Sequence, residues 1–533
     1  MVKTQASEVP VLIVGAGPTG ATLGIELGRR GVACRVVDRL VGPVTTSRSF
    51  TLHARTLELF EMAGIADRFL ERGLCAVSMD YHFKGTAEPA RLDFSQLRSR
   101  YPFALIINQN VTEQVLRDQL TALGTTVEWA TELRSLSQEP DGWLTARLVH
   151  QPCGLEEIVR TRWLVGCDGV QSTVRAQLDI PYEGGEYTGM QMRMMDAPVR
   201  GFPLEDDRIH YFISTARLLL VTKLPGANYR VLISDLQGTP ATETARSAFQ
   251  DVLDEHFCGS VSLGEPEWAT VFRIWKRVTP RYRHGRVFLA GDAAHCHSPA
   301  GGQGMNVCVQ DAFNLGWKLA LVCAGEADES LLDTYEQERR PIAQHVIEGT
   351  NALYSIIMAH GTSIEDRIAL SREPSFTQQA ISKISGLVYH YRDHYRDAAK
   401  PPGFPQLGGL ATGDRTPDTR LNPGLRLHDL LRHERHTLLI LPSDAGSAAL
   451  DGLVGDLTRR FGTWLRVEVL APAHGDATPS TSVIAAESDD AQLSHGAADG
   501  DVFCLVRPDG YLAMRGRFTD SPALLAALTE YLS

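Results

Sequence analysis

The sequence lacks the features that mark membrane, secreted and nucleic-acid-binding proteins. No apolar run approaches the roughly 18 residues that a membrane-spanning helix needs. The opening segment MVKTQASEVP has no apolar core of the kind found in secretory signals. The formal net charge is −12, whereas binding to a phosphate backbone needs clustered Lys and Arg. We therefore expect a cytoplasmic protein with a small-molecule partner, and neither nucleic acid nor membrane.

Cysteine is scarce, and its spacing gives no sign of a disulfide framework or a metal site. The nine cysteines are scattered, and none forms a C-x-x-C pair. This pattern favours reduced packing residues. Cys296 lies between His295 and His297, but adjacent positions have the wrong spacing for zinc ligands. We expect no metal.

A glycine-rich turn near the N-terminus is the first cofactor signal. An apolar run over residues 9–14 predicts a buried strand, and a helical stretch follows the turn as far as Arg30. Glycines there allow a tight turn and let a pyrophosphate approach the backbone at a helix N-terminus. A purely structural glycine turn is the alternative. The predicted cofactor contacts in this motif are Gly15, Gly17, Pro18, Thr19 and Gly20.

An acidic residue follows at the spacing of a dinucleotide site. Residues 33–37 predict a second strand that ends at Asp38, where a carboxylate can bind a ribose hydroxyl. FAD and NAD share that ribose, so this motif alone leaves open which of them binds. Arg39 beside it is also predicted to contact the cofactor.

A second glycine-rich segment lies far along the chain. Residues 286–290 predict a strand, followed by GDAAH, by PAGGQGMN and by a helix over residues 307–323. An acid at a strand end and glycines at a helix N-terminus indicate another cofactor contact. Two contacts so distant in sequence suit a long cofactor. A simple dehydrogenase would not need the second one.

These segments together resemble one enzyme family. GDAAH, PAGGQGMN and QDAFNLGWKLA resemble the flavin-contacting segment of class A, p-hydroxybenzoate hydroxylase-like aromatic monooxygenases, in the phenol hydroxylase and polyketide hydroxylase branch. CDGVQSTVR at residues 167–175 resembles the DG fingerprint of that family, and Gln109 in NQNVTEQVL resembles its flavin-side glutamine. The four matches occur in the order of the family.

The resemblance implies FAD as the bound cofactor, with NAD(P)H and O2 as co-substrates. It assigns Asp292 to the pyrophosphate and ribityl region, Gln109 to the ribityl chain and Asp38 to the adenosine ribose. Asp168 would lie near the pyrophosphate, although it could instead cap the helix at Ser172. Arg48 would approach flavin and nicotinamide, unless it is a surface charge. Further cofactor contacts implied are Gly169, Gly291, Pro299, Gly302, Gly304, Met305 and Asn306.

The predicted fold class is α/β, with four segments. Residues 1–181 and 283–400 would form the two parts of a Rossmann-like FAD-binding domain, and the second part would add helices. Strand patterns over residues 182–282 predict an inserted, mainly-β substrate domain. After a Pro/Gly-rich linker, residues 401–533 resemble the thioredoxin-like domain of the phenol hydroxylase branch, with a role in packing or homodimer formation.

The family activity would be hydroxylation of an aromatic, phenolic molecule through a flavin C4a-hydroperoxide. Arg48 and Pro299 would lie at the reaction centre, and His210 or Tyr211 could assist deprotonation of the phenol. Predicted substrate contacts are Met192, Met194, Tyr211, Leu219, Arg273 and Trp275. The methionines favour a bulky ligand such as a polycyclic polyketide of antibiotic biosynthesis. Baeyer–Villiger oxygenation of a polyketide ketone and a non-catalytic flavin module are the alternatives.

Overall fold

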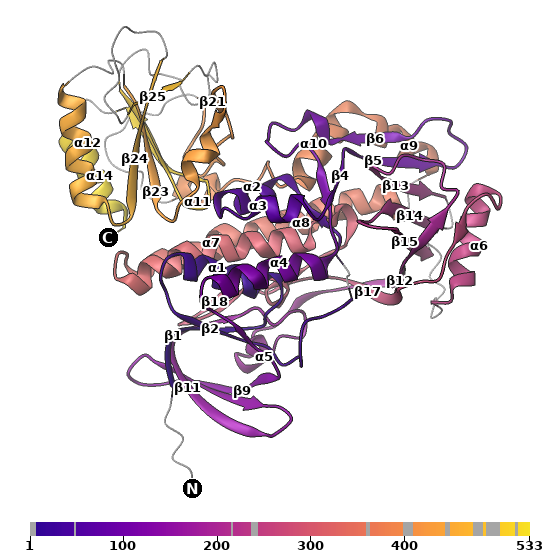
Figure 1. The fold of residues 1–533 in the computed structure, drawn as a ribbon, viewed down its shortest axis with the longest axis horizontal. Helices are drawn as coiled ribbons and strands as arrows, with labels where there is room; N and C mark the ends of the chain where they lie inside the picture. Colours follow the sequence, from indigo (N-terminus) through magenta and orange to yellow (C-terminus); the bar gives the residue numbers. More distant parts are fainter. Residues whose placement is uncertain are drawn as a thin grey trace.

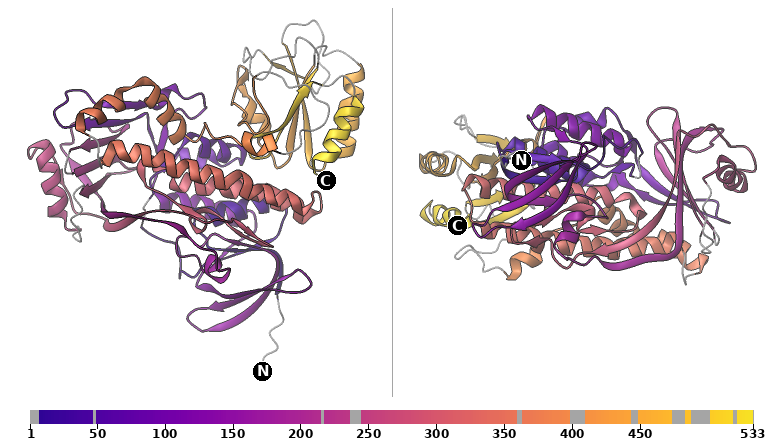
Figure 2. Two further views of the ribbon diagram at one scale, coloured as in Figure 1. Left: turned by 180° about the vertical axis from the view of Figure 1, so that it is seen from behind. Right: turned by 90° about the horizontal axis from the view of Figure 1, so that it is seen from below.

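The molecule is elongated, with a separate C-terminal domain at one end and a large β-sheet at the other (Figure 1). The computed structural model describes residues 7–46, 49–214, 217–235, 244–358, 363–397, 409–442, 448–472, 483–486, 501–517 and 521–532. Both views of Figure 2 likewise show the C-terminal domain and the large β-sheet at opposite ends. Within the described residues, no helix is long and apolar enough to cross a membrane.

The first sheet is built around parallel strands from distant parts of the chain. Its main path runs in the order β18-β19-β11-β1-β2-β8, and an antiparallel pair, β9 and β10, extends from β11. Val11, Leu12 and Ile13 are fully buried, as expected for a strand covered on both faces. The strands are β1 (Ser7–Val14), β2 (Cys34–Val37), β8 (Val127–Glu128), β9 (Thr131–Gln138), β10 (Leu144–His150), β11 (Leu155–Gly166), β18 (Arg283–His284) and β19 (Val287–Leu289).

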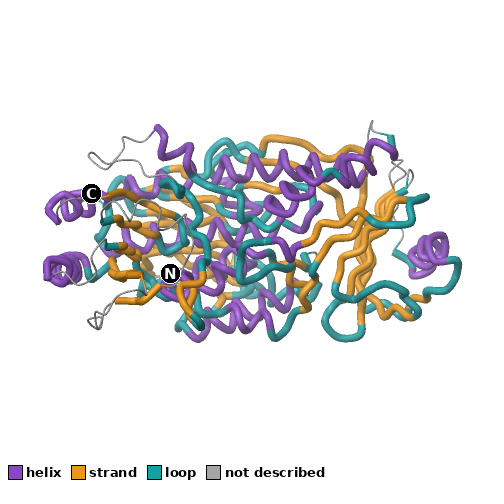
Figure 3. The backbone as a smooth tube through the Cα atoms, turned by 90° about the horizontal axis from the view of Figure 1, so that it is seen from above, coloured by secondary structure: helices purple, strands orange, loops and turns teal. Residues whose placement is uncertain are grey.

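Helices surround this sheet, and a small antiparallel sheet lies beside them. The helices of this half are α1 (Pro18–Arg29), α2 (Ala54–Met62), α3 (Ala66–Leu70), α4 (Gln109–Ala122), α5 (Thr173–Gln177), α7 (Gly304–Ala324) and α8 (Asp333–Met358). The small sheet has the order β3-β7-β4, from β3 (Thr51–Leu52), β4 (Leu74–Ala76) and β7 (Ala104–Ile106). Seen from above, helices fill the middle of the molecule and strands gather at both ends (Figure 3). This half is the Rossmann-like part that the glycine motifs predicted.

The second large sheet has nine strands in the main order β20-β17-β12-β15-β14-β13-β5-β6, with β16 paired to β12. Its strands are β5 (Ser78–Phe83), β6 (Ala90–Asp93), β12 (Glu183–Arg200), β13 (Arg208–Ile213), β14 (Arg217–Lys223), β15 (Asn228–Asp235), β16 (Ser262–Leu263), β17 (Trp268–Val278) and β20 (His295–Cys296). The strands β5 and β6 come from well before the predicted insertion, and β5 pairs in parallel with β13. The sheet therefore joins two parts of the chain that lie far apart in sequence.

The two faces of this sheet are covered differently. The face that carries Tyr211 packs against α10 (Pro374–Ile384), with α9 (Ile364–Arg372) beside it. The opposite, outer face carries Leu219 and packs against α6 (Arg246–Phe257). Because side chains alternate along each strand, neighbouring residues point to opposite faces.

The C-terminal domain has a five-stranded sheet in the order β25-β24-β23-β26-β27. Strand β23 pairs in parallel with β24 and antiparallel with β26, which forms an antiparallel pair with β27. This is the thioredoxin-like arrangement expected. Cys504 is buried in β26, and burial raises the pKa of its thiol to about 11. The elements are α11 (Arg392–Asp397), β21 (Arg420–Asn422), β22 (Leu425–Arg426), β23 (His436–Leu441), α12 (Ala448–Phe461), β24 (Leu465–Pro472), β25 (Val483–Ala486), β26 (Val502–Val506), β27 (Leu512–Arg517) and α14 (Ser521–Tyr531).

A buried ion network joins this domain to α7 and α8. The Arg507 guanidinium donates to both carboxylate oxygens of Glu338, at 2.6 and 3.0 Å. Lys318 on α7 donates to Glu338 at 2.8 Å, and Arg507 also pairs with Asp509. The side chains are at most 3% exposed. The charges compensate one another, as buried charges must.

Candidate active site

A groove follows the carboxyl ends of β1, β2 and β11. In parallel α/β sheets, ligands bind at this edge. The predicted contacts Gly15, Gly17, Pro18, Asp38, Arg39, Gln109, Asp168 and Gly169 all line the groove. Sequence motifs that lie more than 100 residues apart therefore meet on one surface.

The glycines of the first motif are required by close backbone contacts. Gly15 has φ +105°, and a Cβ there would lie 2.3 Å from the Cys167 carbonyl oxygen. A Cβ at Gly20 would lie 1.9 Å from the Gly15 carbonyl oxygen. Gly17 precedes α1 and faces open space. Helix α1 has no side-chain N-cap, so its first N–H groups are available to a pyrophosphate.

Asp38 and Gln109 are held in place by hydrogen bonds at the groove. The Asp38 carboxylate accepts from the Ala16 N–H at 2.8 Å and from the Leu40 N–H at 2.9 Å. The Gln109 side chain accepts from the Ser49 N–H at 3.2 Å and donates to Glu113 at 2.9 Å. Burial raises the pKa of Glu113. Both predicted side chains are thus oriented on the groove wall.

Asp168 caps the short helix α5, as the alternative interpretation stated. Its carboxylate accepts from the Ser172 hydroxyl at 2.5 Å and from the backbone N–H groups of Thr173 and Val174. It also lines the groove. Burial outweighs these hydrogen bonds and raises its pKa. Its first role is to fix the turn after β11, with Gly169 at φ +77° in that turn.

The second cofactor segment contacts the first. Gly291 has φ +62°, and a Cβ there would lie 2.4 Å from the Thr19 hydroxyl oxygen. Asp311 on α7 accepts from the Gly291 N–H at 3.1 Å and pairs with His295 and Arg339, both at 2.7 Å. Burial alone would raise the pKa of Asp311, but the two partners outweigh it and lower that pKa. His295 is therefore part of the support of this turn.

Asp292 is exposed and lies in the turn between Gly291 and His295. One of its carboxylate oxygens accepts from the Cys308 thiol at 3.4 Å. Its neighbours Gly291 and Ala293 are buried, which fixes the backbone while the carboxylate faces outward. This position is open to a ligand.

The glycine loop, which we define as Pro299–Asn306, leads into α7. Gly301 and Gly302 have φ +77° and +66°, a conformation that side chains with a Cβ rarely adopt. Gly304 begins α7, which has no side-chain N-cap. Met305 and Asn306 are buried in its first turn. The loop and the helix start thus offer backbone N–H groups to an anion.

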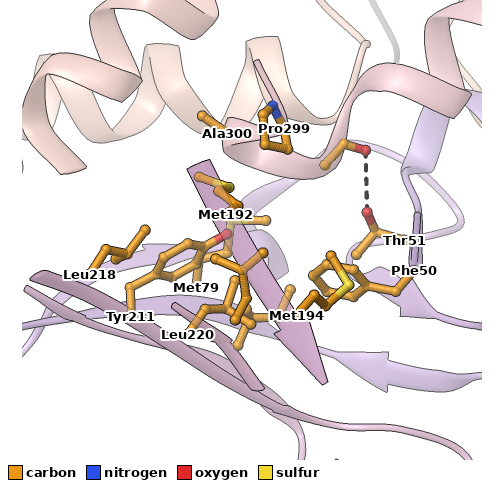
Figure 4. Close-up of a pocket in the computed structure, with 13 residues that line it drawn as sticks. Phe50, Thr51, Met79, Met192, Met194, Tyr211, Leu218, Leu220, Pro299 and Ala300 are labelled. Carbon is orange, nitrogen blue, oxygen red and sulfur yellow. Dashed lines mark hydrogen bonds between the residues drawn. The ribbon is translucent and has the colours of Figure 1, made fainter. Parts of the chain in front are cut away.

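A cavity separates the glycine loop from the second sheet. Figure 4 shows that Pro299 and Ala300 lie on one side and that Met192, Met194, Tyr211, Leu218 and Leu220 lie on the other. The lining residues are Phe50, Thr51, Met79, Met192, Met194, Ile209, Tyr211, Leu218, Leu220, Leu232, Pro299, Ala300 and Gly302.

Three of the predicted substrate contacts lie elsewhere. Leu219 points to the outer face of the sheet, toward α6. On β17, Ile274 packs with the residues around the cavity, so alternation directs Arg273 and Trp275 away from it. Arg273 pairs with Glu186 in solvent, and Trp275 stacks on Arg277. These three expectations were wrong, whereas Met192, Met194 and Tyr211 line the cavity.

His210 also lies on the outer face, which contradicts its predicted role in deprotonation. One ring nitrogen contacts His82 at 3.2 Å, and the other donates to the Glu205 carbonyl oxygen at 2.9 Å. Asp80 is nearby, and the three side chains are close enough to hold a metal ion. However, Asp80 already pairs with Arg91 and Arg208. We interpret the cluster as charge-balanced packing.

Several cavity residues escaped the sequence analysis. Phe50 and Thr51 belong to the segment that carries Arg48, and Met79 lies on β5, which had no predicted place in the substrate sheet. Ile209, Leu218 and Leu232 follow the same alternation as Tyr211 and Leu220. The alternation of apolar and polar residues over 78–83 was the available signal. Arg48 itself lies outside the described residues.

Comparisons with known proteins agree with this geometry. A family model described as FAD binding domain matches residues 8–350. A pentachlorophenol 4-monooxygenase from Sphingobium chlorophenolicum is 43% identical over 531 residues, which cover 99% of this chain and 97% of the relative. A 6-methylpretetramide 4-monooxygenase from Streptomyces rimosus is 35% identical over 541 residues, covering 98% and 94%.

A solved structure extends the likeness to the whole fold. The anhydrotetracycline hydroxylase from Streptomyces rimosus matches with a TM-score of 0.76 and 30% identity, over 98% of this chain and 99% of that structure. The match includes the C-terminal domain, because almost the full length is covered. Together with the glycine motifs, the groove and the cavity, these matches show that the chain belongs to the FAD-binding family of class A flavoprotein monooxygenases, the aromatic hydroxylases.

Proposed function

We propose that this chain uses NAD(P)H and O2 to hydroxylate an apolar phenol bound in the cavity. One observation carries the proposal: Pro299, Ala300 and Gly302 of the glycine loop form part of the cavity wall. The same loop leads into α7, beside the segment that would support the cofactor. A ligand in the cavity would therefore lie next to the bound cofactor.

The residues present fit FAD. The uncapped start of α1 suits the pyrophosphate, and Asp38 suits the adenosine ribose. Gln109 and Asp292 would hold the ribityl region, and the start of α7 would face the ring. When bound, the flavin would supply the redox chemistry that couples NAD(P)H oxidation to the insertion of one oxygen atom of O2 into the aromatic ring, with the other oxygen released as water.

The protein would contribute position and exclusion of water. The cavity wall is almost entirely apolar, with three methionines, two aromatic rings and branched aliphatic side chains. An apolar wall keeps water from a reactive oxygen species and holds the substrate in one orientation. The thioethers of Met79, Met192 and Met194 can adapt to a flat ligand.

Tyr211 would supply a polar contact for the substrate oxygen. Its ring extends from β13 into the cavity (Figure 4) and stacks on Tyr81, with ring centroids 4.9 Å apart. Burial raises the pKa of Tyr211 well above its ordinary value, so the hydroxyl stays protonated. It would therefore act as a hydrogen-bond donor to a phenolate, which favours the electron-rich form of the ring, and not as a base.

The wall also restricts the class of substrate. None of the thirteen described residues that line the cavity is charged. A buried carboxylate would need a cation to balance it, so we propose a phenol without a carboxylate, with one ring or a few fused rings. A polycyclic polyketide stays within this class.

The test is NAD(P)H oxidation by the FAD-loaded protein with a panel of mono- and polycyclic phenols and matched carboxylated phenols. We expect uncharged phenols to stimulate oxidation and to gain one oxygen, and the carboxylated partners to do neither. A protein that cannot be loaded with FAD would overturn the proposal. Because Baeyer–Villiger oxygenation adds the same mass, the product structure must be solved by NMR.

A further inference from the structure

The glycine loop is clasped by three residues on its inner side. We call Thr51, His53 and Asn306 the loop clasp. The Asn306 amide donates to the carbonyl oxygens of Thr51 at 3.0 Å and of Gly302 at 2.9 Å. The backbone N–H of His53 donates to the Asn306 side-chain oxygen at 2.8 Å. All three are at most 2% exposed.

His53 makes the contact that reaches the turn of the loop itself. Its Nε2 lies 2.7 Å from the Gly301 carbonyl oxygen. A carbonyl can only accept, so this nitrogen carries the proton. Burial lowers the pKa of His53 from its ordinary 6.5 to about 4, so the ring is neutral at physiological pH. The bond is therefore a neutral N–H donating to Gly301.

The hydrogen bond from His53 acts on the part of the loop whose backbone has the most conformational freedom. Gly301 and Gly302 both have positive φ, and glycine has the largest conformational freedom of any residue. The Thr51 hydroxyl donates to the Gly302 carbonyl oxygen at 3.2 Å, the dashed bond in Figure 4. Hydrogen bonds from Thr51, His53 and Asn306 thus fix a turn that would otherwise sample several conformations.

The clasped turn forms a wall of the substrate cavity. Thr51, Pro299, Ala300 and Gly302 line the cavity, while His53 lies just behind them and does not. We propose that His53 is a positioning residue that holds the glycine loop between cofactor and substrate, and so sets how efficiently oxygen transfer is coupled to NAD(P)H oxidation. This inference rests on the proposed function, but its first readout, FAD binding, does not.

The decisive comparison uses His53→Gln, whose amide can donate to Gly301, and His53→Met, which keeps the volume but cannot donate. The matched control is His82→Gln. Burial likewise lowers the pKa of His82 to about 4, but it lies on the outer face of the second sheet. For each FAD-loaded protein we would measure the dissociation constant of FAD, the visible spectrum of the bound flavin and the H2O2 formed per NAD(P)H.

We expect His53→Met to bind FAD about tenfold more weakly, which corresponds to one lost hydrogen bond. Its flavin spectrum should shift, and its share of H2O2 should rise several-fold. His53→Gln should recover most of each loss, and His82→Gln should match the wild type. The proposal is overturned if His53→Met leaves FAD affinity, spectrum and coupling unchanged, or if His53→Gln is as impaired as His53→Met.

A failure to fold would be seen separately by circular dichroism and thermal melting. If His53→Met does not fold, Asn306→Asp carries the test, because it removes the amide donor to Thr51 and Gly302 while keeping the acceptor for the His53 backbone N–H. A rise in the FAD dissociation constant then supports the clasp, and an unchanged constant overturns it. If the wild type forms no aromatic product, the proposed function fails, whereas the FAD readouts still decide the role of His53.

Discussion

Glu338 holds the buried ion network together, so its removal should weaken the whole molecule. Its carboxylate accepts from Arg507, Lys318 and Asn314 at 2.6 to 3.0 Å, and its side chain is 1% exposed. Removing one partner of a buried ion pair costs about 3–5 kcal/mol. Since glutamine still accepts one hydrogen bond, we expect Glu338→Gln to lower the free energy of unfolding by about 3 kcal/mol.

A second substitution tests the reason for that loss. In Lys318→Met/Glu338→Gln, one positive and one negative charge are removed, and Arg507 keeps its pair with Asp509. The double variant should therefore be more stable than Glu338→Gln alone, although it carries one more change. Urea unfolding followed by tryptophan fluorescence measures both, because Trp317 lies 5.1 Å from the Arg507 guanidinium. The reasoning is refuted if Glu338→Gln unfolds like the wild type, or if Lys318→Met makes it worse.

Three further predictions concern the site. Tyr211→Phe should keep FAD affinity but raise the KM for phenols about tenfold, through the loss of one hydrogen bond; an unchanged KM in steady-state assays would argue against this contact. Gly302→Ala should abolish tight FAD binding in titrations, because the added Cβ would lie 2.2 Å from the Thr51 hydroxyl oxygen. The control Gly452→Ala should leave FAD binding unchanged, because Gly452 faces open space. The pKa of His53 falls from 6.5 to about 4 on folding. Between these two pH values the imidazole is protonated in the unfolded state and neutral in the folded state. The free energy of unfolding therefore decreases as the pH falls through that window. The loss is about 3 kcal/mol, and melting curves of His53→Gln should be less acid-sensitive than those of the wild type.

The cofactor groove was predictable because its signals are local. Each of Gly15, Asp38 and Gly291 follows a buried strand within one or two residues, and the chemistry of a strand end depends on few neighbours. Asp168 lines the same groove and also has its alternative role as a helix cap. Such short-range patterns survive without any knowledge of the tertiary fold.

The cavity was harder, because its wall depends on which face each strand presents. Tyr211 and Leu219 both lie in strands rich in apolar residues, yet only Tyr211 faces the cavity. A shift of one residue in register exchanges the two faces, and β14 and β17 carry large side chains on both. Met79 was missed for another reason: β5 reaches the sheet by pairing with β13, about 130 residues later in the sequence, and no local pattern records that pairing.

The junction between α7, α8 and the C-terminal sheet limits how this enzyme could be shortened. Arg55 is 1% exposed, donates to the Asp509 carbonyl oxygen and lies under the Tyr511 ring. Without the C-terminal domain, Arg55 and Trp317 would be exposed to solvent, and Glu338 would lose Arg507 as its ion-pair partner. A shortened catalyst would first require a redesign of this exposed surface. The C-terminal domain is therefore a structural part of the enzyme and cannot simply be removed.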